Sequence, residues 1–252
     1  MYFLKESYYN ENKGVWKTMK IEIWSDYVCP FCYIGKKQLE IALDGLGYGD
    51  AIEVEYKSFL LDPTTPEDAA GSVLENLSQK YGMSIEEAKK MSDGIAMRAK
   101  EVGLDFNFED MKNANTVKAH RLAKWAESQG KGKAYTERVL KAYFTEGELI
   151  GQSDVLLTLV EEVGLSRDAA QQVLAGEDYL QDMQQDIAIA QQLGVRGVPF
   201  FVIDQKYGIS GAQPKEVFED TITKAAEEAG LRKPLKMQGG TGATCTDESC
   251  EI

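Results

Sequence analysis

The chain has 252 residues, of which 43% are hydrophobic and 27% charged, and its formal net charge is −13. This is the composition of a globular protein, and the negative charge argues against nucleic acid or an anionic membrane surface as a partner. Its apolar runs are far shorter than the roughly 20 residues of a membrane-spanning helix.

Residues 1–18 mix charged residues with Asn and Tyr, and they lack the apolar segment of a secretory signal. We expect them to form an N-terminal extension, either a leader from an upstream start or a loosely held segment. The four cysteines occur as two closely spaced pairs. This usage predicts a cytoplasmic protein, because disulfides in a reducing compartment are usually transient and catalytic.

The next segment has the pattern of a βαβ unit. Residues 20–25 alternate between polar and apolar, residues 31–43 follow a helical period, and residues 51–60 alternate again. A strand–helix–strand crossover implies two parallel strands. Residues 62–66 (DPTTP) then break the chain.

A long series of helical segments follows, and most of them end in Gly. Ser84 and Glu87 have the spacing of a capping box at the start of one helix. No fixed sequence period relates the segments, so we predict an all-helical insertion and not a repeat array. The predicted helices cover residues 84–102, 115–129, 133–146, 154–163, 167–175 and 178–193.

The chain then returns to β structure. Residues 198–203 have the pattern of a short buried strand, residues 205–209 pair with it as a hairpin, and residues 214–229 form a last amphipathic helix. The predicted fold is therefore α/β, with a mixed four-stranded sheet and a large all-helical insertion after the second strand. The predicted domains are residues 19–64 with 195–231, the insertion at 65–194, and a mobile tail at 232–252.

The segment Cys29-Pro30-Phe31-Cys32 lies between the first strand and its helix. A helix N-terminus carries unpaired N–H groups and partial positive charge, so we expect a lowered pKa and a nucleophilic thiolate at Cys29. Cys32, one turn further in, is the expected resolving thiol. Half of a zinc site has the same spacing, but a strand before and a helix after favour redox chemistry.

The chain resembles the thioredoxin superfamily, and within it the FrnE-like cytoplasmic members of the DsbA-like branch. These are related to 2-hydroxychromene-2-carboxylate isomerases and kappa-class glutathione transferases. The resemblance covers residues 19–230. Its matching stretches are residues 25–35 (SDYVCPFCYIG), Asn115-Thr116 with residues 119–121 (AHR), and residues 194–202 (GVRGVPFFV).

The resemblance implies a thioredoxin fold, disulfide oxidoreductase activity and no metal. It also implies a cis bond between Val198 and Pro199 beside the redox pair, which turns the Val198 backbone towards an extended substrate. Pro30 and Phe31 are expected to contact the same substrate. Aromatic residues beside the cysteines are usually core residues, yet they also suit an apolar rim for flexible substrates; they are Trp24, Tyr27, Phe31 and Tyr33.

His120 is the only histidine. A lone His on a half-apolar helix is usually a packed or surface residue. The resemblance instead places Asn115 and His120 near a cleft between the two domains, where they line a substrate pocket or tune Cys29. Both interpretations stay open at this point.

Cys245 and Cys250 form a second pair in the tail. Some FrnE-like proteins carry such a C-x4-C, so this pair is a candidate accessory dithiol that exchanges with Cys29 and Cys32. An inert or regulatory disulfide and half of a four-cysteine metal site are the alternatives.

Three functions compete. The first is a thiol–disulfide oxidoreductase or isomerase acting on disulfide-containing or thiol proteins, with glutathione or a thioredoxin-system reductant as redox partner. The second is a glutathione-dependent isomerase or transferase acting on a small aromatic substrate, but those relatives carry Ser where Cys29 stands and have no use for a resolving thiol. The third is a chaperone-like binding protein. Substrate, net direction of electron flow and oligomeric state, monomer or homodimer, are open.

Overall fold

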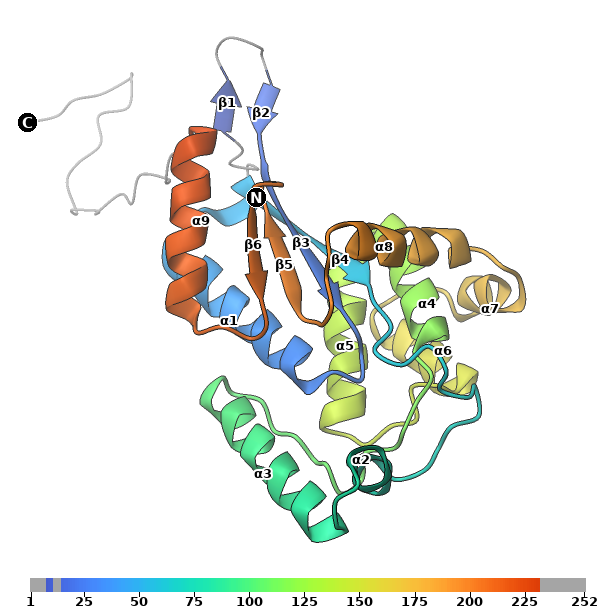
Figure 1. Ribbon diagram of the computed structural model, residues 1–252. Helices are drawn as coiled ribbons and strands as arrows, with labels where there is room; N and C mark the ends of the chain where they lie inside the picture. The colour runs from blue at the N-terminus through green and yellow to red at the C-terminus, as the bar shows by residue number, and fades with distance from the viewer. Residues whose placement is uncertain (1–7, 11–14, 232–252) are drawn as a thin grey trace, which may run out of the picture.

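The computed structural model of the protein describes residues 8–10 and 15–231 (Figure 1). The central sheet contains β3 (Met19–Ser25), β4 (Ile52–Ser58), β5 (Phe200–Ile203) and β6 (Tyr207–Ser210) in the order β4-β3-β5-β6. β3 runs parallel to β4 and antiparallel to β5, and β5 runs antiparallel to β6. The predicted mixed four-stranded sheet is therefore confirmed.

One face of the sheet is covered by α1 (Pro30–Leu46) and α9 (Lys215–Ala229) (Figure 1). The alternating residues Ile21 and Ile23 of β3 point into this layer, where Phe201 of β5 packs edge-on against Phe218 of α9. A single 3-10 turn at Gly49–Ala51 joins α1 to β4. This layer is the apolar core of the thioredoxin-like part.

The segment between β4 and β5 is helical, as predicted. Its own apolar core includes Leu122, Tyr135 and Phe144. The Ser84–Glu87 capping box is present at the start of one of the helices. Those helices are α2 (Val73–Tyr81), α3 (Ile85–Glu101), α4 (Val117–Ser128), α5 (Gly132–Phe144), α6 (Ser153–Glu162), α7 (Arg167–Ala175) and α8 (Leu180–Gln192).

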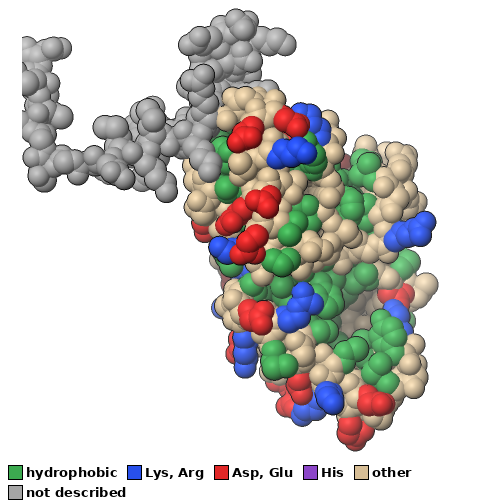
Figure 2. Space-filling model, turned by 60° about the vertical axis from the view of Figure 1, so that its left-hand side comes forward, with side chains coloured by type: hydrophobic (Ala, Val, Ile, Leu, Met, Phe, Trp, Pro, Cys, Tyr) green, Lys and Arg blue, Asp and Glu red, His purple; other side chains and the backbone are tan. Residues whose placement is uncertain are grey.

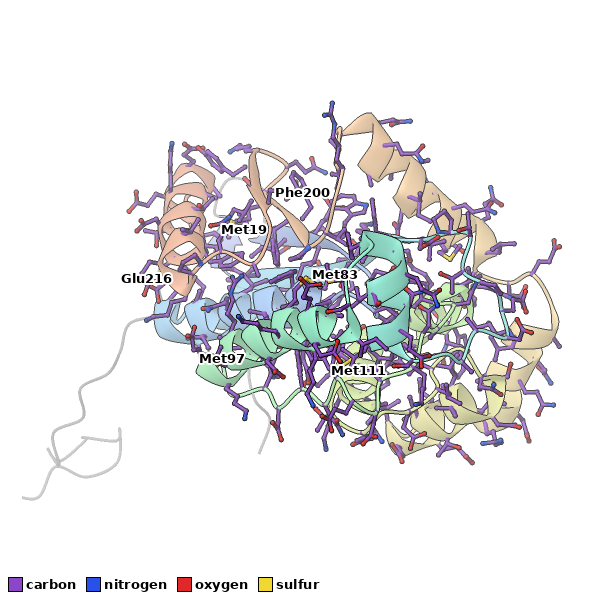
Figure 3. The ribbon with its side chains drawn as sticks, turned by 60° about the horizontal axis from the view of Figure 1, so that its bottom comes forward. Met19, Met83, Met97, Met111, Phe200 and Glu216 are labelled. Atoms are coloured by element: carbon purple, nitrogen blue, oxygen red, sulfur yellow. The ribbon has the colours of Figure 1, made fainter. Side chains whose placement is uncertain are left out.

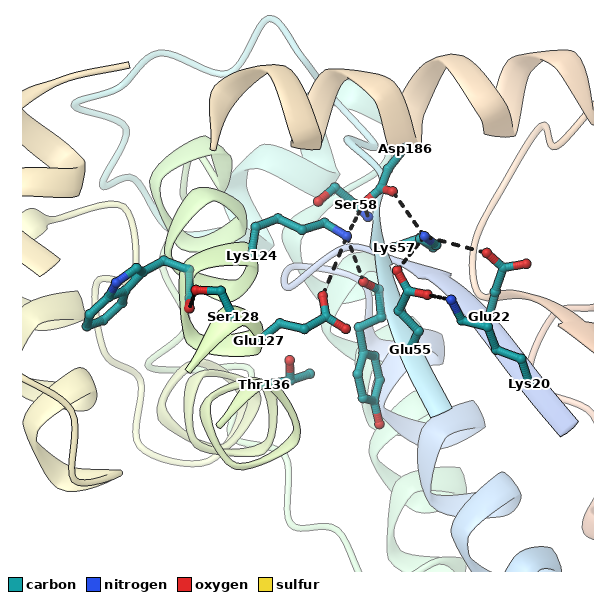
Figure 4. A network of polar contacts seen from close by, with 12 residues as sticks. Lys20, Glu22, Glu55, Lys57, Ser58, Lys124, Glu127, Ser128, Thr136 and Asp186 are labelled. Carbon is teal, nitrogen blue, oxygen red and sulfur yellow. Dashed lines mark hydrogen bonds and ion pairs between the residues drawn. The ribbon is translucent and has the colours of Figure 1, made fainter. Parts of the chain in front are cut away.

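A buried polar network ties the helical part to the edge strand β4 (Figure 4). The Asp186 carboxylate of α8 accepts a hydrogen bond from the Ser58 N–H (2.9 Å) and pairs with Lys124 of α4 (2.5 Å). Lys124 in turn donates to the Tyr56 carbonyl oxygen at 3.1 Å, and the Trp24 indole donates to the Asp186 carbonyl oxygen at 2.8 Å. Backbone groups of the edge strand are thereby satisfied, and the two parts are held in one arrangement.

The N-terminal extension contains a two-stranded antiparallel hairpin, β1 (Tyr8–Asn10) with β2 (Val15–Lys17), which the sequence analysis did not anticipate. The hairpin projects beyond the sheet at the start of β3 (Figure 1). Within the described residues, none of the helices has the length and apolar character needed to cross a membrane. The tail at 232–252, with Cys245 and Cys250, lies outside the described residues.

Candidate active site

The two cysteines of the C-x-x-C segment sit at the N-terminus of α1. Cys29 is the N-cap residue with extended backbone, and Pro30 takes the first helical position, where a missing N–H costs nothing. The Cys32 N–H donates to the Cys29 carbonyl oxygen at 3.0 Å. Cys29 and Cys32 are only 4% and 1% exposed, and both are free thiols.

The environments of the two thiols differ. Burial raises the pKa of Cys32 well above its ordinary value, and contact with the Cys29 sulfur raises it further. Hydrogen bonds from the Ser25 side chain and the Asp26 backbone offset only part of this increase. Cys32 is thus held as a protonated thiol behind Cys29, which faces the solvent-accessible side.

The loop before β5 lies against Cys29. The Val198–Pro199 peptide bond is cis, as predicted, and the Cys29 thiol donates to the Val198 carbonyl oxygen at 3.5 Å. A Cβ placed on Gly35 of α1 would lie 3.0 Å from Pro199 Cγ, so the glycine permits the close approach of helix and loop.

The start of α1 is also fixed to the helical part. Lys36 is 3% exposed, and its ammonium pairs with Glu40 on the same helix and with Glu137 on α5. The Tyr33 hydroxyl donates to the same Glu137 carboxylate at 2.7 Å. Because burial in this contact disfavours the phenolate, the pKa of Tyr33 is raised.

A cleft of about 390 Å³ opens at Cys29, between the start of α1 and the pair α2–α3. Its walls are mainly apolar and come from both parts of the chain. From the thioredoxin-like part and its outgoing loop the lining residues are Asp26, Val28, Cys29, Pro30, Phe31, Leu61, Asp62, Thr65 and Val198. From the helical part they are Val73, Asn76, Leu77, Lys80, Tyr81, Met91, Ile95, Phe108, Met111, Asn113, Ala114, Thr116, Tyr143 and Phe144.

The structure brings Cys29, Pro30, Phe31 and Val198 together on this cleft, and Cys32 lies directly behind Cys29. Of the four flanking aromatic residues, Phe31 alone lines the cleft. The others are buried in the core; they are Trp24, Tyr27 and Tyr33.

Asn115 and His120 do not line the cleft. The Asn115 side chain accepts a hydrogen bond from the Val117 N–H at 3.0 Å and donates to the Thr65 carbonyl oxygen at 2.7 Å, which orders the start of α4. His120 is 4% exposed, and its Nε2 lies 3.3 Å from Asp26 Oδ1. Its side chain therefore contacts the cleft wall at Asp26.

Sequence analysis assigned no role to Asp26. This residue is 1% exposed and lies at the inner wall of the cleft. Its Oδ2 accepts the Leu61 N–H at 2.8 Å, and its carbonyl oxygen accepts the Cys29 N–H at 3.2 Å. An acidic residue three positions before Cys29 was the available signal, but the sequence does not reveal that it is buried and paired with a distant histidine.

Residues 20–223 match the family model of the DSBA-like thioredoxin domain. The chain belongs to the DsbA-like thioredoxin family. A curated relative, the uncharacterized protein YwbO of Bacillus subtilis, is 32% identical over 208 residues, which is 82% of this chain and 96% of the relative.

Several solved structures share the fold of this chain. A probable DsbA oxidoreductase from Streptomyces coelicolor is 36% identical, with a TM-score of 0.80 over 93% of this chain and 99% of the other. A 2-hydroxychromene-2-carboxylate isomerase has the same fold, at 15% identity and a TM-score of 0.62 over 85% of this chain and 100% of the other. So does the cytosolic disulfide reductase DsbM of Pseudomonas aeruginosa, at 17% identity and a TM-score of 0.59 over 83% of this chain and 99% of the other. The finer FrnE-like assignment stays a prediction.

Half of a metal site is the alternative to a redox pair at Cys29 and Cys32. Within residues 8–10 and 15–231, no group of three or more His, Cys, Asp and Glu side chains is placed to hold a metal ion. The proposed four-cysteine arrangement also requires Cys245 and Cys250, which lie outside those residues.

Proposed function

We propose that this DsbA-like protein is a cytoplasmic thiol–disulfide oxidoreductase that acts on protein cysteines through Cys29 and Cys32. The observation that carries the proposal is the asymmetry of the pair: Cys29 opens on the cleft, and Cys32 is buried directly behind it with a raised pKa. The Cys29 sulfur can react with a substrate while Cys32 stays protonated behind it. Disulfide exchange through a mixed disulfide needs one attacking sulfur and one resolving thiol of this kind.

In the reducing direction, the Cys29 thiolate attacks one sulfur of a substrate disulfide. A Cys29–substrate disulfide forms, and the other substrate sulfur leaves as a thiolate. The Cys32 sulfur then attacks the Cys29 sulfur and loses its proton to the departing group. The second substrate thiol is released, the Cys29–Cys32 disulfide forms, and two electrons have passed to the substrate.

The oxidising direction is the reverse sequence of steps. Cys29 is the N-cap residue of α1, so its side chain lies at the partly positive end of that helix. The Val198 carbonyl oxygen, 3.5 Å from the Cys29 sulfur, places peptide backbone beside the reacting atom. Glutathione or a thioredoxin-system protein is the proposed partner that recycles the pair, and Cys245 with Cys250 a proposed accessory dithiol.

Trapping tests the roles of the two cysteines. The Cys32→Ser variant, mixed with a disulfide-containing protein, is expected to accumulate a mixed disulfide on Cys29, because the adjacent resolving thiol is gone. The Cys29→Ser variant is expected to form none. Equal trapping by both variants, or trapping by neither, would sink the proposal.

The same variants address the isomerase alternative. An isomerase of the 2-hydroxychromene-2-carboxylate type needs no resolving thiol. Glutathione-dependent turnover of a small aromatic substrate that survives Cys32→Ser would favour that class, whereas disulfide exchange that stops with Cys32→Ser favours the oxidoreductase.

A further inference from the structure

The pair α2–α3 forms one wall of the cleft. α2 contains no buried residue. At its start, the Val73 N–H donates to the Met111 carbonyl oxygen (3.2 Å), and the Asn113 N–H donates to the Gly71 carbonyl oxygen (2.7 Å). In Figure 1 the two helices lie away from the sheet, α3 below α1 and α2 below α5.

One side of this wall is apolar and faces the cleft. Leu77 and Tyr81 are one turn apart on α2, and Met91 and Ile95 are one turn apart on α3, so each pair presents one stripe. Tyr81 and Met91 are 61% and 38% exposed, so the fold does not use them as core. We call these four residues the α2–α3 stripe. Figure 3 shows the two helices from below. Figure 2 shows hydrophobic side chains exposed among charged ones on the lower half of the side that it presents.

The charges around the cleft decide between classes of ligand. Its lining contains one cation, Lys80, whose ammonium lies 3.3 Å from Asp62. Asp62 also lines the cleft, and so does a second acid, Asp26, which lies beside His120. Arg98 of α3 lies over the Phe31 ring, 5.2 Å from its centroid, and does not line the cleft.

A ligand rich in carboxylates therefore finds no unpaired cation in the lining and meets a chain of net charge −13. Glutathione is such a ligand. A neutral or basic polypeptide segment with apolar side chains suits both the charge and the surface, and the flexible Met91 side chain adapts to different shapes.

We propose that the α2–α3 stripe is a specificity subsite. It binds apolar residues that flank the reacting cysteine in a neutral or basic polypeptide segment, while that cysteine lies at Cys29. The inference rests on the proposed function and adds the substrate class to it. It makes peptide cysteines with apolar neighbours faster partners than glutathione.

A matched pair of double variants tests the stripe. Tyr81→Ser/Met91→Ser removes two exposed side chains that line the cleft. Ile85→Ser/Met97→Ser removes two side chains that are 50% and 65% exposed on α3 but do not line it. Both pairs are at the surface, so both proteins are expected to fold, and circular dichroism with a thermal unfolding curve checks this.

Each variant is made in the Cys32→Ser background, and the rate of mixed-disulfide formation on Cys29 is measured with three probes. The probes are a basic peptide disulfide with Leu and Phe beside the cysteine, the same peptide with Ser at those positions, and glutathione disulfide. We expect the apolar peptide to react fastest, and Tyr81→Ser/Met91→Ser to slow it about tenfold, equivalent to about 1.4 kcal/mol. The two other probes and the Ile85→Ser/Met97→Ser variant should show less than a twofold change.

Two results would overturn the subsite while leaving the oxidoreductase proposal standing. One is glutathione disulfide as the fastest probe, and the other is an equal slowing of all three probes by Tyr81→Ser/Met91→Ser. If none of the probes forms a mixed disulfide on Cys29, the proposed function itself fails, and the subsite fails with it.

Discussion

Gly35 of α1 and Pro199 of the loop before β5 are in direct contact across the site. A Cβ on Gly35 would lie 3.0 Å from Pro199 Cγ and 3.2 Å from Phe201 Cζ. The contact sets how closely the helix that carries Cys29 can approach the loop that carries the Val198 carbonyl oxygen. The geometry around the reacting sulfur therefore depends on a residue with no chemistry of its own.

Gly35→Ala should separate α1 from this loop. We expect a loss of about 1–3 kcal/mol in the free energy of unfolding, because the added methyl group overpacks a closed contact, together with slower mixed-disulfide formation on Cys29. Gly94→Ala is the matched control, since Gly94 is also helical and nothing lies within 4 Å of its added Cβ. Alanine there should be neutral or stabilising by up to about 1 kcal/mol. Similar changes in urea unfolding for both variants would contradict the role of the contact.

The buried side chains of Asp26 and His120 should contribute cooperatively to the free energy of unfolding. His120→Ala leaves Asp26 Oδ1 without its partner while Oδ2 keeps the Leu61 N–H, so we expect a loss of about 1–3 kcal/mol. A double-mutant cycle with Asp26→Asn, followed by urea unfolding, checks this. Coupling of at least about 0.5 kcal/mol is expected, and strictly additive effects would show that the two side chains are energetically independent.

The buried Cys32 thiol should make stability depend on pH. Its pKa is raised in the native state, so above the thiol pKa of the unfolded chain, about 8.5, the unfolded state loses a proton that the native state keeps. The stability contributed by this thiol is complete below that pH and is lost as the pH rises towards the native pKa. Between about pH 8.5 and 10, the free energy of unfolding of the reduced protein should therefore fall.

The Cys32→Ser variant is the comparison for that pH dependence. Its free energy of unfolding should fall by about 1–2 kcal/mol less than that of the parent across the same window, since one pKa unit corresponds to 1.36 kcal/mol. Urea titrations at several pH values under reducing conditions measure it. Parallel curves for parent and variant would mean that Cys32 is not held as a buried thiol.

Asp186 should be the most sensitive residue of the polar network at the sheet edge. Its side chain is 6% exposed, accepts a hydrogen bond from the Ser58 N–H and pairs with the ammonium groups of Lys124 and Lys57. Asp186→Ala leaves the Ser58 N–H without its acceptor and leaves Lys124 with only the more distant Glu127 carboxylate at 3.8 Å, for which we expect a loss of about 3–5 kcal/mol. Asp186→Asn, whose amide oxygen can still accept from Ser58, should cost less. Equal losses for the two variants in thermal or urea unfolding would contradict the charge-based explanation.

Much of the fold follows from local signals in the sequence. Alternation predicted β3 and β4, and the Ser84–Glu87 box fixed the start of α3 correctly. α2 received no separate prediction, because a nine-residue helix with no buried residue has little apolar periodicity to detect. The β1–β2 hairpin was missed for a related reason, since three-residue strands are too short to show a period.

The chemistry of the site was easier to predict than its walls. A C-x-x-C after a strand and before a helix indicates where the thiols lie, because strand and helix place them locally. Whether a polar residue faces the cleft depends on long-range packing, which is why Asn115 was predicted to bind substrate although its amide orders the start of α4. Asp26 was overlooked for the converse reason, since its partner His120 is 94 positions away in the sequence.

Redox titration shows whether Cys29 and Cys32 form a disulfide with each other. The full chain is equilibrated with glutathione mixtures of graded potential, and free thiols at each position are counted by alkylation and mass spectrometry. We expect one two-electron transition that forms a Cys29–Cys32 disulfide, with a midpoint between about −270 and −120 mV. If both thiols stay free at every potential, or form only glutathione adducts without closing on each other, the pair is not a redox pair and the oxidoreductase proposal is wrong.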